Sequence, residues 1–300
     1  MVWLKRISLF ILTNILVMTT LSIAWSLLSG FLGFRGSPGT MSLLMIWCLF
    51  WGMGGAFISL FLSKVMAKWM MGLQMIDPNT NSPQERDLIT MVNNLAERAG
   101  LPQMPEVAIY DSPDINAFAT GPSRSNSLVA VSTGLLANMT RDEVEGVLGH
   151  EVAHIANGDM VTMTLIQGIV NAFAMFFSRI ISNIIASQVD EKISGVVHFI
   201  SVIVFDLMFT ILGSIVVNYF SRQREFRADA GGAQFAGKQK MINGLRRLQR
   251  QFESIEPSSN LDNGAGLATL KISNRSTGLM AFFSTHPPLE ERIQRLETAV

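Results

Sequence analysis

Cysteine, histidine and charged residues are all scarce in this chain of 300 residues. Its one cysteine, Cys48, lies in an apolar run, which excludes a disulfide framework and a cysteine-based metal site. Charged residues make up only 15% of the chain, whereas soluble domains average about 25%. The formal net charge is zero, so electrostatics gives no reason to expect a nucleic-acid partner. Much of the chain is therefore expected to face something other than water.

Long uncharged runs near the N-terminus predict a transmembrane hairpin over residues 1–63. Residues 7–34 and 41–63 contain no charged side chain, and each run exceeds the roughly 20 residues that span a bilayer. The first run is also longer than the apolar core of a cleavable signal peptide, which is about 7–15 residues. Gly52 and Ala56 have the small-residue spacing that lets two helices pack closely.

Two later apolar runs, residues 161–186 and 196–219, predict a second transmembrane hairpin over 161–218. Both contain polar residues, so helices buried in a soluble core are the alternative interpretation. If both runs cross the membrane, Arg179 and Asp206 lie at similar depths. We then expect them to form an ion pair, because an unpaired charge at that depth is costly.

Basic residues at the ends of these runs predict the orientation. They are Lys5, Arg6, Lys64, Lys68, Arg222, Arg224 and Arg227. Because such residues favour the cytoplasmic side, we expect four crossings with both termini in the cytoplasm. Residues 64–160 and 219–300 would then form one cytoplasmic domain, interrupted by the second hairpin.

The soluble segments carry the signals of an α+β domain with a small sheet. Capping signals predict helices that begin after Ser82 and Thr140, and amphipathic patterns predict helices over residues 240–252 and around Leu289. The segment 256–277 is rich in Ser, Asn and Gly and is expected to be a mobile loop. The strand candidates are Glu106–Tyr110, Asn116–Thr120 and Leu128–Ser132.

Two of the four histidines belong to the sequence His150-Glu151-Val152-Ala153-His154. On a helix, residues four apart share a face, so both imidazoles can bind one metal ion. Glu151 can then accept the proton of a water that the metal activates. The alternative is two unrelated histidines on an ordinary helix. A hydrolase site also requires a third ligand.

The strongest candidate for the third ligand is Glu225, and Asp229 lies one helical turn beyond it. The Asp229 carboxylate could accept a hydrogen bond from a ligating imidazole and orient its ring. Alternatively, both acids pair with the arginines of the same segment. The residues alone favour neither interpretation.

Four motifs, taken with the two hairpins, resemble the HtpX family of membrane metalloproteases, which is related to the CAAX prenyl proteases. They are Asn116–Gly121, His150–His154, Ser221–Asp229 and Ser284–Pro287. The resemblance implies a mainly α membrane protein with a zincin-like (gluzincin) domain. It also implies one zinc ion per chain, bound by His150, His154 and Glu225, with Glu151 as the catalytic base and Asp229 as the supporting carboxylate.

The resemblance further implies a role in stress-linked quality control at the bacterial inner membrane, on membrane proteins or unfolded polypeptides. Asn116, Ala117 and Phe118 would lie on the edge strand along which an extended substrate binds. Candidates for the group that stabilises the oxyanion are His286, Tyr219 and the arginines near Glu225. His286 could instead cover the zinc as a removable lid or cap the final helix.

Three other classes of protein compete with this interpretation. A scaffold or chaperone with structural zinc would close the fourth coordination position, and only His286 is available for that. A di-iron bundle needs a Glu-x-x-His pair on each of two helices, and only Glu151–His154 has that spacing. An intramembrane protease would bury its motif in an apolar helix, but this motif is preceded by the charged residues Arg141, Asp142, Glu143 and Glu145.

Overall fold

The computed structural model describes residues 23, 27, 41–255 and 285–299. Nearly all of the apolar run 7–34 and the whole of the expected loop 256–277 lie outside these residues. The chain divides into two compact units. One comprises the chain up to Phe61 together with Met163–Val217, and the other comprises Leu62–Thr162 together with the chain from Asn218 onward.

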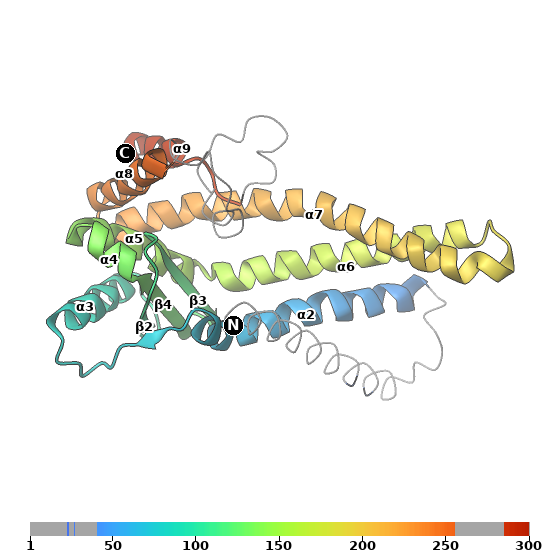
Figure 1. Cartoon of the computed structure of the whole chain (residues 1–300), viewed down its shortest axis with the longest axis horizontal. Coiled ribbons are helices and arrows are strands. Elements are labelled where there is room, and N and C mark those ends of the chain that lie inside the picture. The colour runs from blue at the N-terminus through green and yellow to red at the C-terminus, as the bar shows by residue number, and fades with distance from the viewer. Residues whose placement is uncertain (1–22, 24–26, 28–40, 256–284, 300) are drawn as a thin grey trace. The chain divides into compact units, whose positions relative to one another are not determined.

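Within the described residues, three helices are long and apolar enough to cross a membrane. They are α2 (Met41–Met70), α6 (Asp159–Ala186) and α7 (Glu191–Ala236), drawn in Figure 1. The apolar side chains of α7 are exposed at Val196, Phe199, Ile203, Leu207 and Ile211. Exposed apolar surface of this extent is typical of a face that contacts lipid. Helix α7 also continues past Tyr219, where the predicted apolar run ends.

Small residues bring α2 and α6 into close contact. A Cβ atom on Gly52 would lie 2.6 Å from the backbone nitrogen of Ala172, and one on Gly168 would lie 3.5 Å from the Cβ of Ala56. Both members of the spacing at Gly52 and Ala56 therefore contact α6. The contact expected for this spacing was one between the first two apolar runs, and most of the first run lies outside the described residues.

The expected ion pair between Arg179 and Asp206 is not among the ion pairs of the described residues, which extend to 4.0 Å. The buried Oδ1 of Asp206 also has no described hydrogen-bond partner. The guanidinium carbon of Arg179 lies 4.6 Å from the centre of the Trp47 ring, and Arg179 donates a hydrogen bond of 3.0 Å to the Met175 carbonyl. A cation over an aromatic face is stabilised by the ring quadrupole. Arg179 therefore has Trp47 and Met175 as partners, both in the same compact unit.

The second unit contains a four-stranded sheet in the order β1-β2-β4-β3. Its strands are β1 (Gln74–Met75), β2 (Glu106–Tyr110), β3 (Ala117–Ser123) and β4 (Asn126–Ser132). Strands β2 and β4 are parallel, and the other two pairs are antiparallel. The three predicted strands are confirmed, although β3 runs three residues further than expected. Strand β3 lies at an edge of the sheet.

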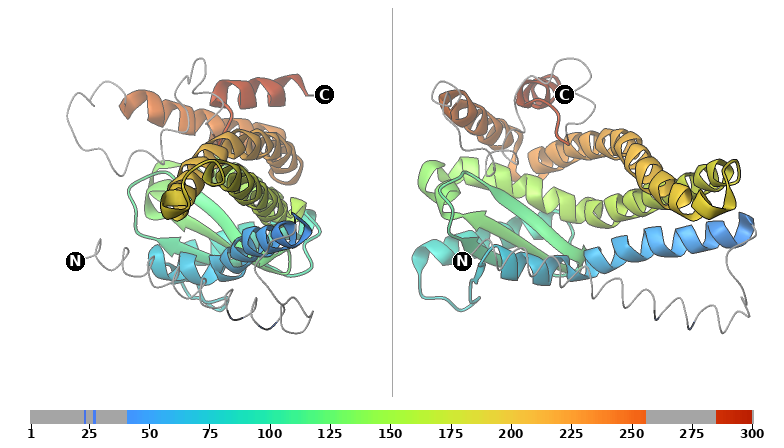
Figure 2. Two further views of the ribbon diagram at one scale, coloured as in Figure 1. Left: turned by 90° about the vertical axis from the view of Figure 1, so that its right-hand side faces the viewer. Right: turned by 45° about the vertical axis from the view of Figure 1, so that its right-hand side comes forward.

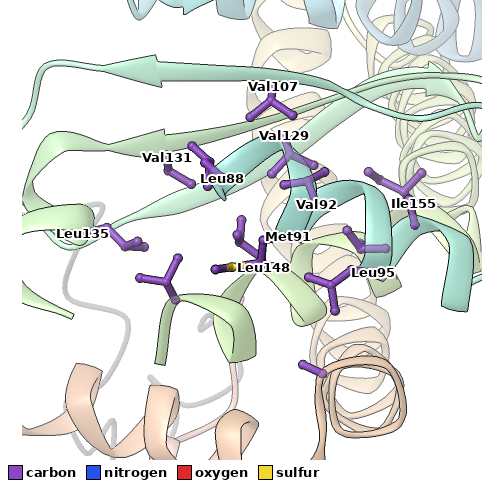
Figure 3. Packing of buried hydrophobic residues seen from close by; sticks show 14 of the residues in the cluster. Leu88, Met91, Val92, Leu95, Val107, Val129, Val131, Leu135, Leu148 and Ile155 are labelled. Carbon is purple, nitrogen blue, oxygen red and sulfur yellow. The ribbon is translucent and has the colours of Figure 1, made fainter. Parts of the chain in front are cut away.

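Alternation along β2 and β4 sends one set of side chains into the main core. Val107, Val129 and Val131 point toward α3 (Pro83–Arg98) and α5 (Arg141–Asn157), as Figure 3 shows. The side chain of Ser82 caps α3 and Thr140 forms the predicted capping box of α5, so both helix starts are confirmed. The short α4 (Thr133–Asn138) follows β4 and adds Leu135 to the same core.

Two amphipathic helices near the C-terminus pack against each other. Helix α8 (Lys238–Ile255) and helix α9 (Leu289–Thr298) share a second buried cluster, and Figure 2 shows them side by side. The cluster comprises Met241, Ile242, Leu245, Leu289, Ile293 and Leu296. The basic residues of α8 lie outside this apolar cluster and contact its neighbours: Lys240 pairs with Glu145 of α5 at 2.7 Å, and Arg246 pairs with Glu297 of α9 at 2.5 Å.

Helices α5 and α7 approach closely because glycines meet at their crossing. A Cβ on Gly149 would lie 2.9 Å from the Cβ of Ala236, and one on Gly232 would lie 2.9 Å from the backbone nitrogen of His150. Real Cβ atoms do not come this close to backbone atoms without displacement. The close crossing therefore depends on glycine, which has no side chain, at these two positions. It joins the two helices that carry His150 and Glu225.

We predict that Gly232→Ala destabilises the fold, because overpacking at a backbone contact costs about 1–3 kcal/mol. Gly195→Ala in the same helix is the matched control, since a Cβ there meets nothing within 4 Å. Thermal unfolding of the purified chain in detergent measures both. The melting temperature should fall by about 2–4 °C per kcal/mol for Gly232→Ala and should not fall for Gly195→Ala. Equal melting temperatures for the two variants would contradict the packing argument.

Candidate metal centre

Helix α5 places His150 and His154 on one face. Their Nε2 atoms lie 3.1 Å apart, and His150 is 8% exposed. The helix ends at Gly158, which has a φ of 68° in the left-handed region and donates its N–H to the carbonyls of His154 and Ile155. The predicted motif therefore sits in the last two turns of a capped helix, beside the core.

Helix α7 brings the Glu225 carboxylate to both imidazoles. Its Oε2 lies 3.3 Å from Nε2 of His150, and its Oε1 lies 3.4 Å from Nε2 of His154. Glu225 is 1% exposed, and no described residue forms a hydrogen bond with either of its carboxylate oxygens. A buried carboxylate in this situation requires a positive charge nearby.

These three residues fit a zinc ion. Zinc binds histidine nitrogen and carboxylate oxygen at about 2.0–2.2 Å in a tetrahedral arrangement, which separates two ligand atoms by about 3.3 Å. The observed separations of 3.1, 3.3 and 3.4 Å agree with that value. His150, His154 and Glu225 could therefore hold the ion together and leave its fourth position for water.

Two further carboxylates lie behind the imidazoles. Asp229 Oδ1 is 2.9 Å from Nδ1 of His150, and Asp159 Oδ2 is 2.6 Å from Nδ1 of His154. A carboxylate at Nδ1 keeps the proton there and leaves the Nε2 lone pair for a metal. A contact of this kind is predicted from the sequence for Asp229 but not for Asp159, although Asp159 directly follows the glycine that ends α5.

Arg292, which is 6% exposed and lies on α9, is a second residue of the site that was not predicted from the sequence. Its guanidinium donates two hydrogen bonds to Asp229, with distances of 2.6 and 2.8 Å. Burial opposes the ionised form of Asp229, but Arg292 and His150 outweigh it and lower the pKa of that carboxyl to about 2. A signal was present, because Arg292 is three residues from Leu289 and four from Leu296 on the apolar face of the predicted helix.

The field of the site favours positive charge. Burial lowers the pKa of His150, but Asp229 and Glu225 outweigh burial and raise it to about 9. The pKa of His154 is also raised: burial and His150 act against the charged form, and Asp159 and Glu225 act for it. The same carboxylates would stabilise a bound divalent cation.

Glu151 points toward the edge strand. Its Oε2 accepts a hydrogen bond of 2.8 Å from the backbone N–H of Ala119 in β3. Because Ala119 directs this N–H at α5, it does not use it to pair with β4. The bond holds one oxygen of the carboxylate, so the orientation of Glu151 is set by the main chain of the edge strand.

A cavity of about 150 Å³ is lined by His150, Glu151 and Glu225. Asn116, Ala117 and His286 line it, whereas Phe118 and Tyr219 are not among its lining residues. His286 Nδ1 lies 3.0 Å from Glu225 Oε2. Arg292 also lines the cavity, and the remaining lining is apolar, namely Ile115, Leu135, Val147, Met241, Leu245, Leu248 and Leu289.

Of the arginines near Glu225 in the sequence, Arg224 has its Nε 3.4 Å from Glu225 Oε1. Arg227 lies 3.6 Å from Asp159 Oδ1. The structure therefore brings together His150, Glu151, His154, Glu225 and Asp229, and adds Asp159, Arg292 and the N–H of Ala119.

Comparisons with known proteins agree with this geometry. The profile of peptidase family M48 matches residues 82–300. A "Protease HtpX homolog" of Bacillus subtilis is 51% identical over 98% of this chain and 99% of its own length. "Protease HtpX" of Pasteurella multocida is 49% identical, covering 97% of each chain.

Among solved structures, the crystal structure of S. mikatae Ste24p is similar in fold. Its TM-score is 0.63 with 18% sequence identity, and the match covers 97% of this chain and 67% of that one. At this identity the likeness concerns the fold alone.

We predict that Arg292→Met destabilises the protein by about 3–5 kcal/mol, because it leaves the buried Asp229 carboxylate without its cation. Arg295→Met is the control: this arginine is on the same helix, but its side chain is 54% exposed and pairs with Glu291 at the surface. Denaturant unfolding in detergent compares the two. A loss for Arg292→Met no larger than that for Arg295→Met would show that the buried pair contributes little.

Proposed function

Because the chain belongs to peptidase family M48 and is a metalloprotease of the HtpX group, we propose that it is a zinc endopeptidase acting on membrane proteins at the cytoplasmic face of the bacterial inner membrane. Unfolded polypeptides are a second class of substrate, and removal of damaged membrane proteins under stress is its role. The observation that carries the proposal is the convergence of His150, His154 and Glu225 at 3.1–3.4 Å.

His150, His154 and Glu225 hold the zinc ion in this proposal. When bound, zinc supplies Lewis acidity, which polarises a peptide carbonyl and makes a water more acidic. Glu151 accepts the proton of the attacking water and then donates it to the leaving amine. The N–H of Ala119 keeps the Glu151 carboxylate in place for both transfers.

Strand β3 receives the substrate. It is an edge strand, and Ala117 lies two residues from Ala119, so both direct their main chains to the same side. An extended peptide beside β3 gains main-chain hydrogen bonds that do not depend on its sequence. Asn116 and Phe118 flank this position on the same segment. A protease that recognises main chain in this way acts on segments that have lost their native structure.

Orientation follows from the charged ends of the apolar helices. Four crossings, with Lys64, Lys68 and Arg222–Arg227 at cytoplasmic ends, place both termini and the metal centre on the cytoplasmic side. In this arrangement residues 1–63 form the first transmembrane hairpin and residues 161–218 form the second. Residues 64–160 and 219–300 together form the protease domain. Loops and tails of membrane proteins on that side become the accessible substrates.

We predict that Glu151→Gln strongly lowers the rate of cleavage while the protein still binds zinc. A general base contributes about 10²–10⁴-fold to the rate, so kcat should fall by that factor. Zinc content and cleavage of casein and of a detergent-solubilised membrane protein are measured together. Glu145→Gln is the control, because Glu145 lies on the same helix and pairs with Lys240 at 2.7 Å.

Cleavage by the Glu151→Gln variant at the wild-type rate would overturn the catalytic assignment. Glu225→Gln is expected to lose both zinc and cleavage, since it removes a charged ligand. A protein that keeps zinc in both variants and never cleaves would instead be a scaffold with a structural ion.

His286 is assigned as the donor that stabilises the oxyanion. We predict that His286→Ala lowers kcat by about 10²–10³-fold, the usual effect of removing one such donor, and leaves zinc content unchanged. A lid over the metal would give a different result, namely weaker zinc binding with turnover kept or increased. If neither property changed, both functional roles of His286 would be wrong; it does not cap α9 either, because the N-cap there is Pro288 and no side chain caps the helix.

A further inference from the structure

Asp159 is the first residue of α6, and it is 1% exposed. Its Oδ2 lies 2.6 Å from Nδ1 of His154. Its Oδ1 is also buried, and no described residue forms a hydrogen bond with that atom. The nearest described cation to Oδ1 is Arg227 at 3.6 Å. His154 is therefore the close polar partner of this carboxylate.

The break between α5 and α6 puts Asp159 in this position. Residues five apart on a continuous helix point in different directions, so Asp159 would face away from His154 if α5 continued. Gly158 takes a φ of 68° and turns the chain, which brings the next side chain back against the ring. Only glycine adopts this conformation without strain. The turn therefore has a consequence for the metal centre, in addition to ending a helix.

The contact repeats the one at the other imidazole. Asp229 faces Nδ1 of His150 from α7, and Asp159 faces Nδ1 of His154 from α6. In both rings Nε2 is then the atom directed at Glu225. Two carboxylates from different helices thus select the same tautomer at both histidines, which two ligands of one ion require.

A purely structural role for Asp159 would be an acid in the first turn of a helix, where the helix dipole favours negative charge. That role is fulfilled at the surface and does not require burial or a partner at 2.6 Å. Glu191 is an exposed acid in the first turn of α7 and illustrates the structural role alone. Asp159 differs from it in both burial and contact.

We propose that Asp159 is a positioning residue that holds the proton on Nδ1 of His154 and orients the ring for zinc. The proposal rests on the proposed function, because it assumes that His154 is a zinc ligand. Loss of such a supporting carboxylate weakens metal binding about 10–100-fold.

The test measures zinc affinity of the full-length chain in detergent by competition with a chromogenic chelator. We expect Asp159→Ala to bind Zn²⁺ about 10–100-fold more weakly than the wild type. Asp159→Asn should also bind Zn²⁺ more weakly than the wild type, by a smaller factor, because its neutral amide oxygen is a weaker acceptor for Nδ1–H than the carboxylate is. Glu191→Ala, the matched first-turn control, should bind like the wild type. The visible spectrum of the Co²⁺ form should change for Asp159→Ala and stay unchanged for Glu191→Ala, since it reports ligand geometry.

The outcomes separate this inference from the proposed function. If Glu225→Ala loses zinc but Asp159→Ala binds it as tightly as the wild type, the positioning role is overturned and the protease site stands. If Glu225→Ala also binds like the wild type, the metal site itself is wrong and both fail. Should Asp159→Ala not fold, the isosteric Asp159→Asn decides: wild-type affinity with an unchanged Co²⁺ spectrum overturns the role, and weaker binding supports it.

Discussion

The burial of the Glu225 carboxylate between His150 and His154 is the constraint on which the rest of the site depends. Glu225 is 1% exposed, and its two carboxylate oxygens face the Nε2 atoms of His150 and His154. An ionised carboxylate out of contact with water is unstable unless cations surround it. Protonated imidazoles meet that requirement, and so does a divalent metal ion. Metal binding and the stability of this region are therefore coupled, because the same charges serve both.

Keeping Glu225 close to the histidines requires two helices to approach more closely than side chains normally allow. Gly149 and Gly232 make this possible at the crossing of α5 and α7. Beyond the crossing, Arg292 neutralises Asp229, so the second carboxylate on α7 can also remain ionised in the interior. The acids and the arginine form one network in which each group depends on the others for its charge state.

The groups proposed for catalysis and for support of the metal come from separated parts of the chain, and several lie at the ends of elements. Asp159 begins α6, Ala119 contributes main chain from an edge strand, and His286 precedes α9. Such positions combine a rigid neighbour with an exposed side, which suits a site that must hold an ion and also admit a peptide. The buried sheet and α3 contribute no ligand, but they hold α5 in place through the main core.

The sequence by itself determined the elements whose signals are local. Apolar length predicted helices over the regions of α2, α6 and α7, and capping residues located the starts of α3 and α5. The spacing within His150–His154 indicated a metal site, since helical periodicity alone brings those rings together. Glu225 and Asp229 were found as candidates, but the residues could not decide between metal binding and pairing with neighbouring arginines.

Only the tertiary structure decided which distant groups meet. Arg292 is 63 residues from Asp229 in sequence, and its place on an apolar helix face gives no indication of its partner. Asp159 is separated from His154 by a left-handed glycine, whose effect on direction is not visible in helical spacing. The bond from Ala119 uses a backbone N–H, so no side chain could have signalled it. Arg179 lies over Trp47 and does not pair with Asp206, because depth along a helix does not specify which face a side chain occupies.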